Sequence, residues 1–474
     1  MSELIELTVG EVAHGGWCVA RAGNDPAGHV VFVRHALPGE RVRARITART
    51  ARFARADAVD ILDASPDRVQ PPCPFAGPGM CGGCDWQHAA PSAQRGIKAA
   101  VVGQQLRRIA GIDHVVKVEP LPGDDGGLGW RTRVTYAVGD DGLAGLRKHR
   151  SHEIVPVTEC PIAHPAVNDL GVPRRRWHGA AAVQAVTTTT GERAVIVTDG
   201  GGPGGRQARQ RGKRLARSAS RYGSASSPGG DRPERPQAAR HAATGHGNLA
   251  KVAADIGAQA GAAVLRSRAA GHFELIHGRP WLHERAAGRD WRLHPGTFWQ
   301  VHPGAADALA AAVMSALAPA SGDGVLDLYS GAGLFSGVLA AAVRPGGWVS
   351  AVEASQSAVR DARRNLRDLP EVRIRRGRVG DVLAAGSADP AAVAGLAVLD
   401  PPRAGAGAEV SQRLARPGPG MSLRRVAYVS CDPATLARDL AVFLRYGWRL
   451  DALRGFDAFP MTHHVECVAT LVRA

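Results

Sequence analysis

The pattern of hydrophobic and polar positions changes along the chain and divides it into three predicted regions. Residues 1 to about 64 alternate apolar and polar positions with frequent Gly and Pro, which is typical of a small barrel of short strands. From about residue 286 to residue 474, short apolar runs alternate with helical stretches. That alternation predicts an α/β fold with a doubly wound, mainly parallel sheet. Residues 65–285 form a central region that combines strand-like runs with a group of cysteines.

One segment inside the central region lacks the pattern of a folded element. Residues from about 200 to 247 are rich in Gly, Ser, Pro and Arg and contain almost no large aliphatic side chains. Such a composition cannot bury enough apolar surface to fold, so it predicts a disordered basic insertion. Its arginines could add affinity for RNA that does not depend on base sequence. A passive linker explains the composition equally well.

Three apolar runs of the α/β region adjoin residues that can carry chemistry. The run 426–429 leads into Cys431, another leads into Asp400, and Glu466 stands directly before a closing strand at 467–472. The carboxyl ends of parallel strands meet at one edge of a sheet, the usual place for reacting groups. A thiol at a helix N-terminus can be a nucleophile, because the helix dipole favours thiolate. A lone cysteine would more often be a small buried hydrophobe.

A glycine turn in the same region predicts a cofactor site. One strand leads into Gly331-x-Gly333, and Glu353 ends the next strand, where a carboxylate can bind two ribose hydroxyls. The arrangement alone does not distinguish NAD from S-adenosylmethionine. Ser336 replaces the third glycine of the dinucleotide fingerprint, and Asp327 suits a cationic ligand without phosphate. These two details favour S-adenosylmethionine.

The net charge of the chain limits the classes of partner that we expect it to bind. The formal net charge is +16 at pH 7, which suggests a polyanionic partner, either nucleic acid or an acidic membrane surface, although an Arg-rich genome would give the same excess. No apolar run reaches the ~18 residues of a membrane span. The first residues are acidic, whereas a signal peptide would begin with basic ones. We expect a cytoplasmic monomer without a membrane partner.

Four of the seven cysteines are candidate metal ligands. In a reducing compartment, clustered cysteines indicate metal binding or catalysis rather than disulfides. Three stand in the spacing Cys73-x7-Cys81-x2-Cys84, and Cys160 is the nearest possible fourth ligand. Four thiolates fit either zinc or an iron–sulfur cluster. The residues themselves leave these two alternatives open.

Three motifs in order resemble the RNA uracil-C5 methyltransferase family, which uses S-adenosyl-L-methionine. They are Asp-Pro-Pro-Arg at 400–403, Ser-Cys-Asp-Pro at 430–433 and Phe-Pro-x-Thr-x-His-x-Glu at 459–466. The resemblance implies a Rossmann-like class I methyltransferase domain at 286–474. It also implies an OB-like, RNA-binding TRAM β-barrel at 1–64 and a small iron–sulfur/β central domain at 65–285.

The resemblance also implies roles for individual residues. Cys431 would add to uracil C6 and Glu466 would remove the C5 proton, which gives 5-methyluridine. Segment 81–88 is similar to the 4Fe-4S segment of the 23S rRNA branch, so the four cysteines named above would hold such a cluster. Arg131 and Arg133 would approach RNA. The predicted cofactor-binding residues are Gln300, Asp327, Tyr329, Gly331, Gly333, Glu353, Asp381 and Asp400.

The chain departs from the family at one position, where Asp432 follows the predicted nucleophile and Asn is common. A neighbouring carboxylate raises the pKa of a thiol unless it is paired, so we expect Arg438 or Arg403 to pair with Asp432.

Other functions account for fewer of these motifs. Family members that combine the barrel with the cysteines resemble the 23S rRNA branch, so the resemblance favours 23S rRNA as substrate, with tRNA as the alternative. A radical S-adenosylmethionine methylthiotransferase would need Cys-x3-Cys-x2-Cys, which the cysteine spacing does not supply. A nicotinamide dehydrogenase would leave Cys431 and Glu466 without a role. A non-catalytic RNA-binding or ribosome-assembly protein predicts that substitution of Cys431 changes nothing.

Overall fold

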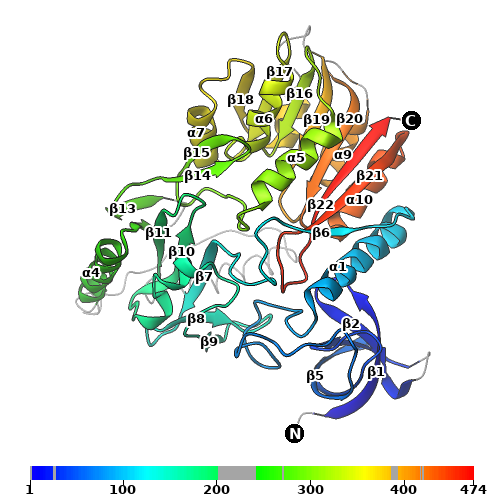
Figure 1. The fold of residues 1–474 in the computed structure, drawn as a ribbon, viewed down its shortest axis with the longest axis vertical. Coiled ribbons are helices and arrows are strands. Elements are labelled where there is room, and N and C mark those ends of the chain that lie inside the picture. The colour runs from blue at the N-terminus through cyan, green and yellow to red at the C-terminus, as the bar shows by residue number, and fades with distance from the viewer. Residues whose placement is uncertain are drawn as a thin grey trace, which may run out of the picture.

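A closed barrel, two large sheets and a separate two-stranded sheet organise the chain (Figure 1). The computed structural model describes residues 3–24, 28–200, 242–268, 272–385, 393–416, 418 and 421–473. Within these ranges, no helix is both long enough and apolar enough to cross a bilayer.

The N-terminal strands close into a barrel in the order β1-β2-β3-β5-β4. Their bounds are β1 (Leu4–Ala13), β2 (Trp17–Arg21), β3 (Val30–Arg34), β4 (Arg41–Arg49) and β5 (Phe53–Asp63). Alternate residues point inward, as Ala54, Ala56 and Ala58 of β5 illustrate, because successive side chains of a strand face opposite sides. The predicted barrel is therefore confirmed.

The central sheet has the order β13-β12-β11-β10-β7-β8-β9. Its strands are β7 (Arg133–Val138), β8 (Ala144–Arg147), β9 (Ile154–Pro156), β10 (Ala180–Thr187), β11 (Arg193–Asp199), β12 (Ala263–Ser267) and β13 (Phe273–His277). Helices α2 (Pro165–Asn168) and α4 (Ala242–Ala260) accompany it.

Helix α4 overlaps the C-terminal end of the predicted disordered insertion. Residues 201–241 of the insertion lie outside the described residues, but α4 begins at Ala242, so 242–247 are helical. Ala253 and Ile256 of α4 are buried in the core of the central domain, and the helix packs on β11, β12 and β13. This tertiary burial extends a helix into a stretch whose composition alone did not indicate one.

The C-terminal sheet has the order β18-β17-β16-β19-β20-β22-β21-β6. Its strands are β6 (Val118–Pro120), β16 (Gly324–Leu328), β17 (Trp348–Glu353), β18 (Val372–Arg376), β19 (Ala394–Leu399), β20 (Met421–Ser430), β21 (Trp448–Asp457) and β22 (Glu466–Arg473). Only β22 runs antiparallel to its neighbours. The predicted doubly wound, mainly parallel sheet is confirmed.

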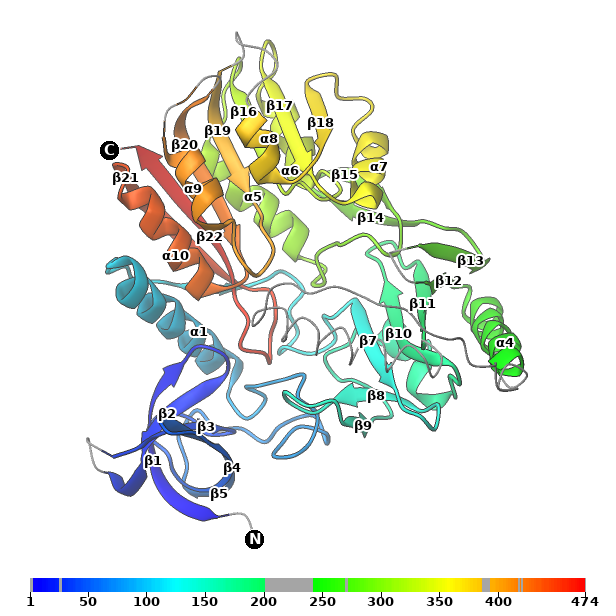
Figure 2. The same ribbon diagram turned by 180° about the vertical axis from the view of Figure 1, so that it is seen from behind.

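Helices cover both faces of this sheet, as Figures 1 and 2 show from opposite sides. They are α5 (Ala305–Leu317), α6 (Leu334–Ala342), α7 (Gln356–Asn365), α8 (Val379–Ala385), α9 (Gly407–Ala415) and α10 (Pro433–Leu444). Before α5 comes a separate hairpin of β14 (Leu282–Ala286) and β15 (Arg289–Leu293), which contains the predicted boundary at 285/286.

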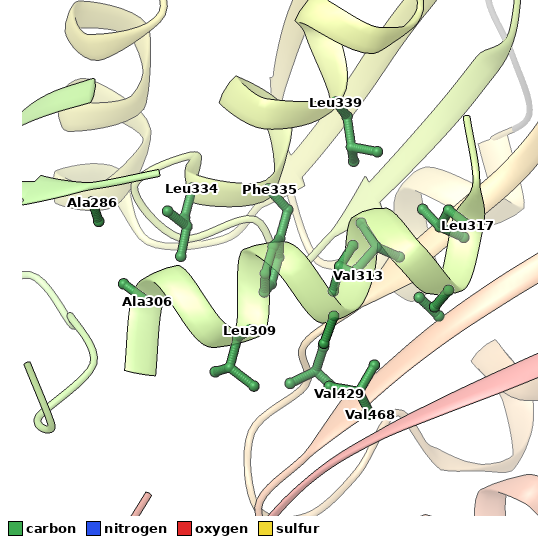
Figure 3. Close-up of a cluster of buried hydrophobic side chains, with 14 of the residues drawn as sticks. Ala286, Ala306, Leu309, Val313, Leu317, Leu334, Phe335, Leu339, Val429 and Val468 are labelled. Carbon is green, nitrogen blue, oxygen red and sulfur yellow. The ribbon is translucent and has the colours of Figure 1, made fainter. Parts of the chain in front are cut away.

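The core under α5 fixes the two strands that matter most for the site. Figure 3 shows Leu309 and Val313 of α5 directed toward Val429 of β20 and Val468 of β22. These residues belong to one cluster in which all four side chains are buried. The spacing of Leu309 and Val313 puts them on one face of the helix. Burial on this face holds β20 and β22 rigidly at the ends where the candidate site begins.

A segment of the predicted central region packs against the C-terminal sheet. Strand β6 pairs with β21, and α1 (Pro91–Gln105) contacts α10. On α1, Lys98 is buried and its Nζ lies 2.5 Å from Asp457 Oδ1 and 2.9 Å from the Phe459 carbonyl oxygen. Gln94 Oε1 accepts a hydrogen bond from the Met461 backbone N–H. Helix α1 therefore holds the loop that precedes β22.

We expect Lys98→Ala to destabilise the protein strongly, by about 3–5 kcal/mol, because it leaves the Asp457 carboxylate buried without a partner. Urea unfolding followed by circular dichroism measures the change. The control is Arg49→Ala, which removes an exposed ion pair with Glu3 and should cost less than about 1 kcal/mol. Equal losses in the two variants would contradict the role given to Lys98.

Candidate active site

Four strands of the C-terminal sheet bring the predicted chemical residues to one edge. In the parallel part, Leu328 of β16 pairs with Leu399 of β19, and Leu399 pairs with Tyr428 of β20. Strands β16 and β19 end at these paired residues, and β20 ends two residues later. Tyr329 and Asp400 therefore follow directly at the same edge of the sheet.

The antiparallel pairing of β20 and β22 adds the last two groups. Ser430 of β20 pairs with Cys467 of β22. Because the strands run in opposite directions, Cys431 and Glu466 both lie one position beyond this pair and face each other across the ladder. Residues that are far apart in sequence are therefore neighbours at the sheet edge.

Cys431 lies in the turn between β20 and α10. Asp432 caps the helix, since its Oδ1 accepts hydrogen bonds from the backbone N–H groups of Ala434 and Thr435. Burial raises the pKa of the Cys431 thiol to about 12, and the Glu466 carboxylate adds to the rise, whereas Arg403 opposes it. The thiol is therefore protonated at neutral pH in the free protein.

The partner of Asp432 differs from the prediction. Its Oδ2 lies 3.2 Å from His14 Nε2, in the turn between β1 and β2 of the barrel. The two predicted partners are engaged elsewhere: Arg438 donates to Asp439 and Arg403 contacts His464. Burial acts to raise the pKa of Asp432, but the bonds from His14 and the Thr435 backbone outweigh it and lower the pKa to about 2.

Three carboxyl groups share this edge. Glu466 is 4% exposed, and burial, followed by the nearby Asp400, raises its pKa well above the usual range. Burial and the charge of Asp327 raise the pKa of Asp400 in the same way. Arg403 is the cation that opposes the rise at Glu466. The edge therefore holds protons at neutral pH and favours the arrival of a positive charge.

The predicted cofactor turn lies beside these carboxyl groups. Tyr329, Gly331 and Gly333 all have positive φ angles, of 64°, 55° and 94°. A side chain at Gly333 would also collide with Leu366, because an added Cβ would lie 2.6 Å from its Cδ1. The glycine there is required both by the backbone conformation and by the close approach of α7 and the residues after it.

Two acids flank the turn. Glu353 accepts hydrogen bonds from the backbone N–H of Gly331, at 3.0 Å, and from Ser355. Asp327 is fully buried, with Oδ2 accepting from Ser336 Oγ, while its Oδ1 has no hydrogen-bond partner among the described residues. Burial raises the pKa of Asp327 to about 6. An unpartnered buried carboxylate oxygen beside an open turn fits a cationic ligand.

Two further predicted cofactor residues lie away from the turn in sequence. Gln300 is half-buried after Trp299, whose ring packs 5.6 Å from that of Trp291. Asp381 is exposed in the first turn of α8. Their contact with a cofactor stays a prediction.

The four predicted cysteine ligands line a single small cavity of about 50 Å³, together with Arg131. Burial raises the pKa values of all four thiols, to about 11 in Cys160. The charge of Arg131 opposes this rise at Cys81 and Cys160 without cancelling it. In the part of the chain that the structure describes, no three His, Cys, Asp or Glu residues are arranged closely enough to hold a metal ion. The four thiols thus share one cavity, and a cluster among them stays a prediction.

The two predicted RNA-binding arginines make contacts inside the protein. Arg131 lines the cysteine cavity, and its Nε donates to the Arg133 carbonyl oxygen. Arg133 Nη1 donates to the Pro295 carbonyl oxygen, and burial lowers its pKa to about 10. Their contact with RNA stays a prediction.

Sequence reasoning missed a polar network that leads to the loop before β22. The backbone N–H and Nδ1 of His463 contact Asp85 Oδ2, and Arg34 Nη2 of the barrel contacts Asp85 Oδ1. The next residue, His464, contacts Arg403. The position of Asp85, directly after Cys84, and the two adjacent histidines were visible signals, but their partners were not.

Known proteins resemble this chain both in separate domains and along nearly its whole length. A family model described as tRNA (Uracil-5-)-methyltransferase matches residues 393–474, and a TRAM domain model matches residues 3–59. An uncharacterized RNA methyltransferase of Streptomyces coelicolor is 46% identical, covering 99% of this chain and 93% of its own. The 23S rRNA (uracil(1939)-C(5))-methyltransferase RlmD of Halomonas elongata is 33% identical, covering 98% of this chain and 89% of its own.

A solved structure supports the fold. The Pyrococcus abyssi tRNA (uracil-54, C5)-methyltransferase in complex with S-adenosyl-L-homocysteine aligns with a TM-score of 0.64 and 21% identity. The alignment covers 99% of this chain and 100% of the other.

We expect slow alkylation of Cys431 by iodoacetamide, at least about tenfold slower at pH 8 than for an ordinary cysteine, because its raised pKa keeps the thiol protonated. The rate should rise with pH beyond 10. Where the pH is high enough to ionise Glu466, Glu466→Gln removes a negative charge that raises the thiol pKa, so it should accelerate the reaction there. Mass spectrometry of the Cys431 peptide gives the rates.

The control is Glu409→Gln, which alters an exposed carboxylate on α9 and should leave the rate unchanged. Rapid modification of wild-type Cys431 at pH 8 would contradict the electrostatic description of the site.

Proposed function

Because this chain belongs to the RNA uracil-C5 methyltransferase family, we propose that it forms 5-methyluridine in RNA with Cys431 as nucleophile and Glu466 as base. The family members are S-adenosylmethionine-dependent enzymes that act on RNA. The observation that supports the two assignments most is the β20–β22 register, which sets Cys431 across from Glu466.

The chemistry needs two groups with separate tasks. The Cys431 thiol gives up its proton to solvent, and its sulfur forms a bond to C6 of uracil as the C5–C6 double bond opens. S-adenosylmethionine would supply the electrophilic methyl group that the electron-rich C5 receives, and its methyl–sulfur bond would break to leave S-adenosylhomocysteine. Glu466 then accepts the C5 proton, the electron pair of that C–H bond restores the double bond, and the C6–sulfur bond breaks to return the thiolate.

The carboxyl groups at the edge suit this sequence. Asp327, Asp400 and Glu466 favour a cation, so a bound sulfonium offsets the burial that keeps Glu466 protonated. The unpartnered Asp327 Oδ1 and the turn at Gly331 and Gly333 fit the cofactor. Glu353 would bind its ribose, and Tyr329, Asp400, Gln300 and Asp381 would complete the site.

The target uridine has to unstack from its neighbouring bases to reach this edge. Unstacking costs a few kcal/mol, and the cost is smallest in a loop or bulge. We favour 23S rRNA as substrate, because the RlmD relative acts on 23S rRNA and aligns along nearly the whole chain. The family model described as tRNA (Uracil-5-)-methyltransferase keeps tRNA as the alternative.

The four cysteines of the small cavity are proposed ligands of a 4Fe-4S cluster. The donor set is consistent with one, since four thiols line one cavity and soft thiolates are the ligands of such clusters. Arg131 favours the thiolate forms of Cys81 and Cys160. The cluster would tie the segment 73–84 to Cys160 of the central domain.

Methyl transfer from labelled S-adenosylmethionine should place label in unmodified 23S rRNA as 5-methyluridine, detected by nucleoside analysis, with bulk tRNA tested beside it. Cys431→Ala should abolish the transfer. Glu466→Gln should trap an RNA adduct that survives denaturation, because the C5 proton cannot leave. Glu409→Gln serves as the control and should behave as wild type.

Normal turnover in either active-site variant would contradict the assigned roles. No label in either RNA, with tight RNA binding retained, would favour a non-catalytic RNA-binding protein.

Anaerobically purified protein should be brown and contain iron and acid-labile sulfide, and Cys160→Ser should lose both. The reason is that loss of one thiolate leaves a cluster iron without its ligand. Metal analysis and visible absorption measure the result, with Cys18→Ser as the matched control in the barrel core. A colourless, zinc-loaded protein would contradict the cluster.

A further inference from the structure

We infer that the barrel completes the active site, with His14 as a positioning residue that holds Asp432 and, through it, the turn that carries Cys431. The inference rests on the proposed function, because it gives the barrel a part in catalysis and not only in RNA binding.

Asp432 joins the barrel to the helix that follows the nucleophile. Its Oδ1 caps α10 at the backbone N–H groups of Ala434 and Thr435, at 3.0 and 2.9 Å. Its Oδ2 lies 3.2 Å from His14 Nε2. One carboxylate thus connects the β1–β2 turn of the barrel with the start of α10, directly beside Cys431.

The same barrel turn also touches the segment that leads to Glu466. The rings of His14 and His463 lie 6.4 Å apart in an edge-to-face arrangement. Gly16 approaches Asp85 so closely that an added Cβ would lie 2.8 Å from its Cγ. Asp85 in turn binds His463 through both its backbone N–H and its ring. The turn at 14–16 therefore contacts both the residue after the nucleophile and the loop before the base.

A second barrel residue reinforces this junction. Arg34 contacts Asp85 Oδ1 at 3.2 Å, and both side chains are almost fully buried, with 6% and 5% exposed. Removal of one partner of such a buried ion pair strongly destabilises the folded protein, because the other charge stays buried without a partner. The barrel is therefore anchored at this place by Arg34, while His14 reaches the catalytic turn.

The position of His14 has an electrostatic consequence for the thiol. Cys431 is faced by the carboxyl groups of Glu466, Asp400 and Asp432 and by the guanidinium of Arg403. Of the three carboxyl groups, Asp432 is the one that pairs with the barrel. A donor at His14 draws the Asp432 carboxylate toward the barrel and partly offsets its charge, which makes the thiolate easier to form.

A double-mutant cycle tests the inference. His14→Ala should lower kcat for methyl transfer on the order of tenfold, with KM for RNA within about twofold, because the contact positions the catalytic turn and does not bind RNA. His14→Gln, which keeps a hydrogen-bond donor, should restore most of the rate. In an Asp432→Asn background, His14→Ala should have little further effect, since the carboxylate that His14 holds is gone. The control is His29→Ala, an exposed barrel histidine.

The alkylation rate of Cys431 supplies a readout that does not depend on turnover. His14→Ala should slow iodoacetamide modification at pH 9 by about threefold, and Asp432→Asn should remove that difference. If wild-type protein transfers no methyl group, the proposed function fails, and the alkylation cycle still decides whether His14 and Asp432 are coupled.

Three results would overturn the inference. They are unchanged kcat and alkylation in His14→Ala, a rise in KM alone, and effects of the His14 and Asp432 substitutions that simply add. Unchanged melting temperatures of the His14 variants exclude misfolding as the cause of a loss.

Discussion

The antiparallel pairing of β22 with β20 and β21 is the constraint on which the candidate site depends. Only this strand enters the sheet from the edge at which the parallel strands end, so it alone can begin with a residue that faces Cys431. A slip of one residue would turn Glu466 to the opposite face of the sheet. The buried contacts of Val429 and Val468 with α5 hold β20 and β22 in this register, and the contact of Lys98 with Asp457 holds the end of the neighbouring strand β21.

The second constraint is electrostatic. Burial places three carboxyl groups and a thiol in one small region with Arg403 as the opposing cation, so several of them remain protonated in the free protein. Such a site is inactive until a cation and a substrate bind, because the nucleophile and the base both have to be ionised to react. Cys431 itself is only partly buried, so solvent can still take the proton of its thiol. The burial of the sheet edge therefore sets the protonation state of the reacting groups.

Much of the α/β domain could be predicted from the chain. Short apolar runs indicate β16, β17, β20 and β22 directly, and the residues after them form the candidate site because parallel strands end at one edge. The spacing of Cys73, Cys81 and Cys84 predicted a shared location for three thiols, and the family resemblance added Cys160; all four line one cavity. The strand pattern and the three-cysteine spacing are local in sequence or follow from a regular sheet.

Other features could not be predicted because they depend on tertiary packing. His14 lies at the opposite end of the chain from Asp432, and no local pattern distinguishes it from other barrel histidines. Strand β6 has three residues, too few for a periodic signal, and its pairing with β21 depends on the docking of α1. The family resemblance predicted that Arg133 approaches RNA, and its hydrogen bond to the Pro295 carbonyl oxygen depends on a contact between residues 65–285 and residues 286–474.

Covalent capture on RNA that contains 5-fluorouridine tests the central claim most directly. In 5-fluorouridine, fluorine replaces the C5 hydrogen that the base would remove as a proton. Sulfur can still add to C6 and the methyl group can still be transferred, but the elimination cannot follow. The account predicts a complex that survives denaturation, depends on S-adenosylmethionine, and yields a cross-linked peptide that contains Cys431. Methylation of ordinary RNA without any such complex, or a cross-link at another cysteine, would contradict it.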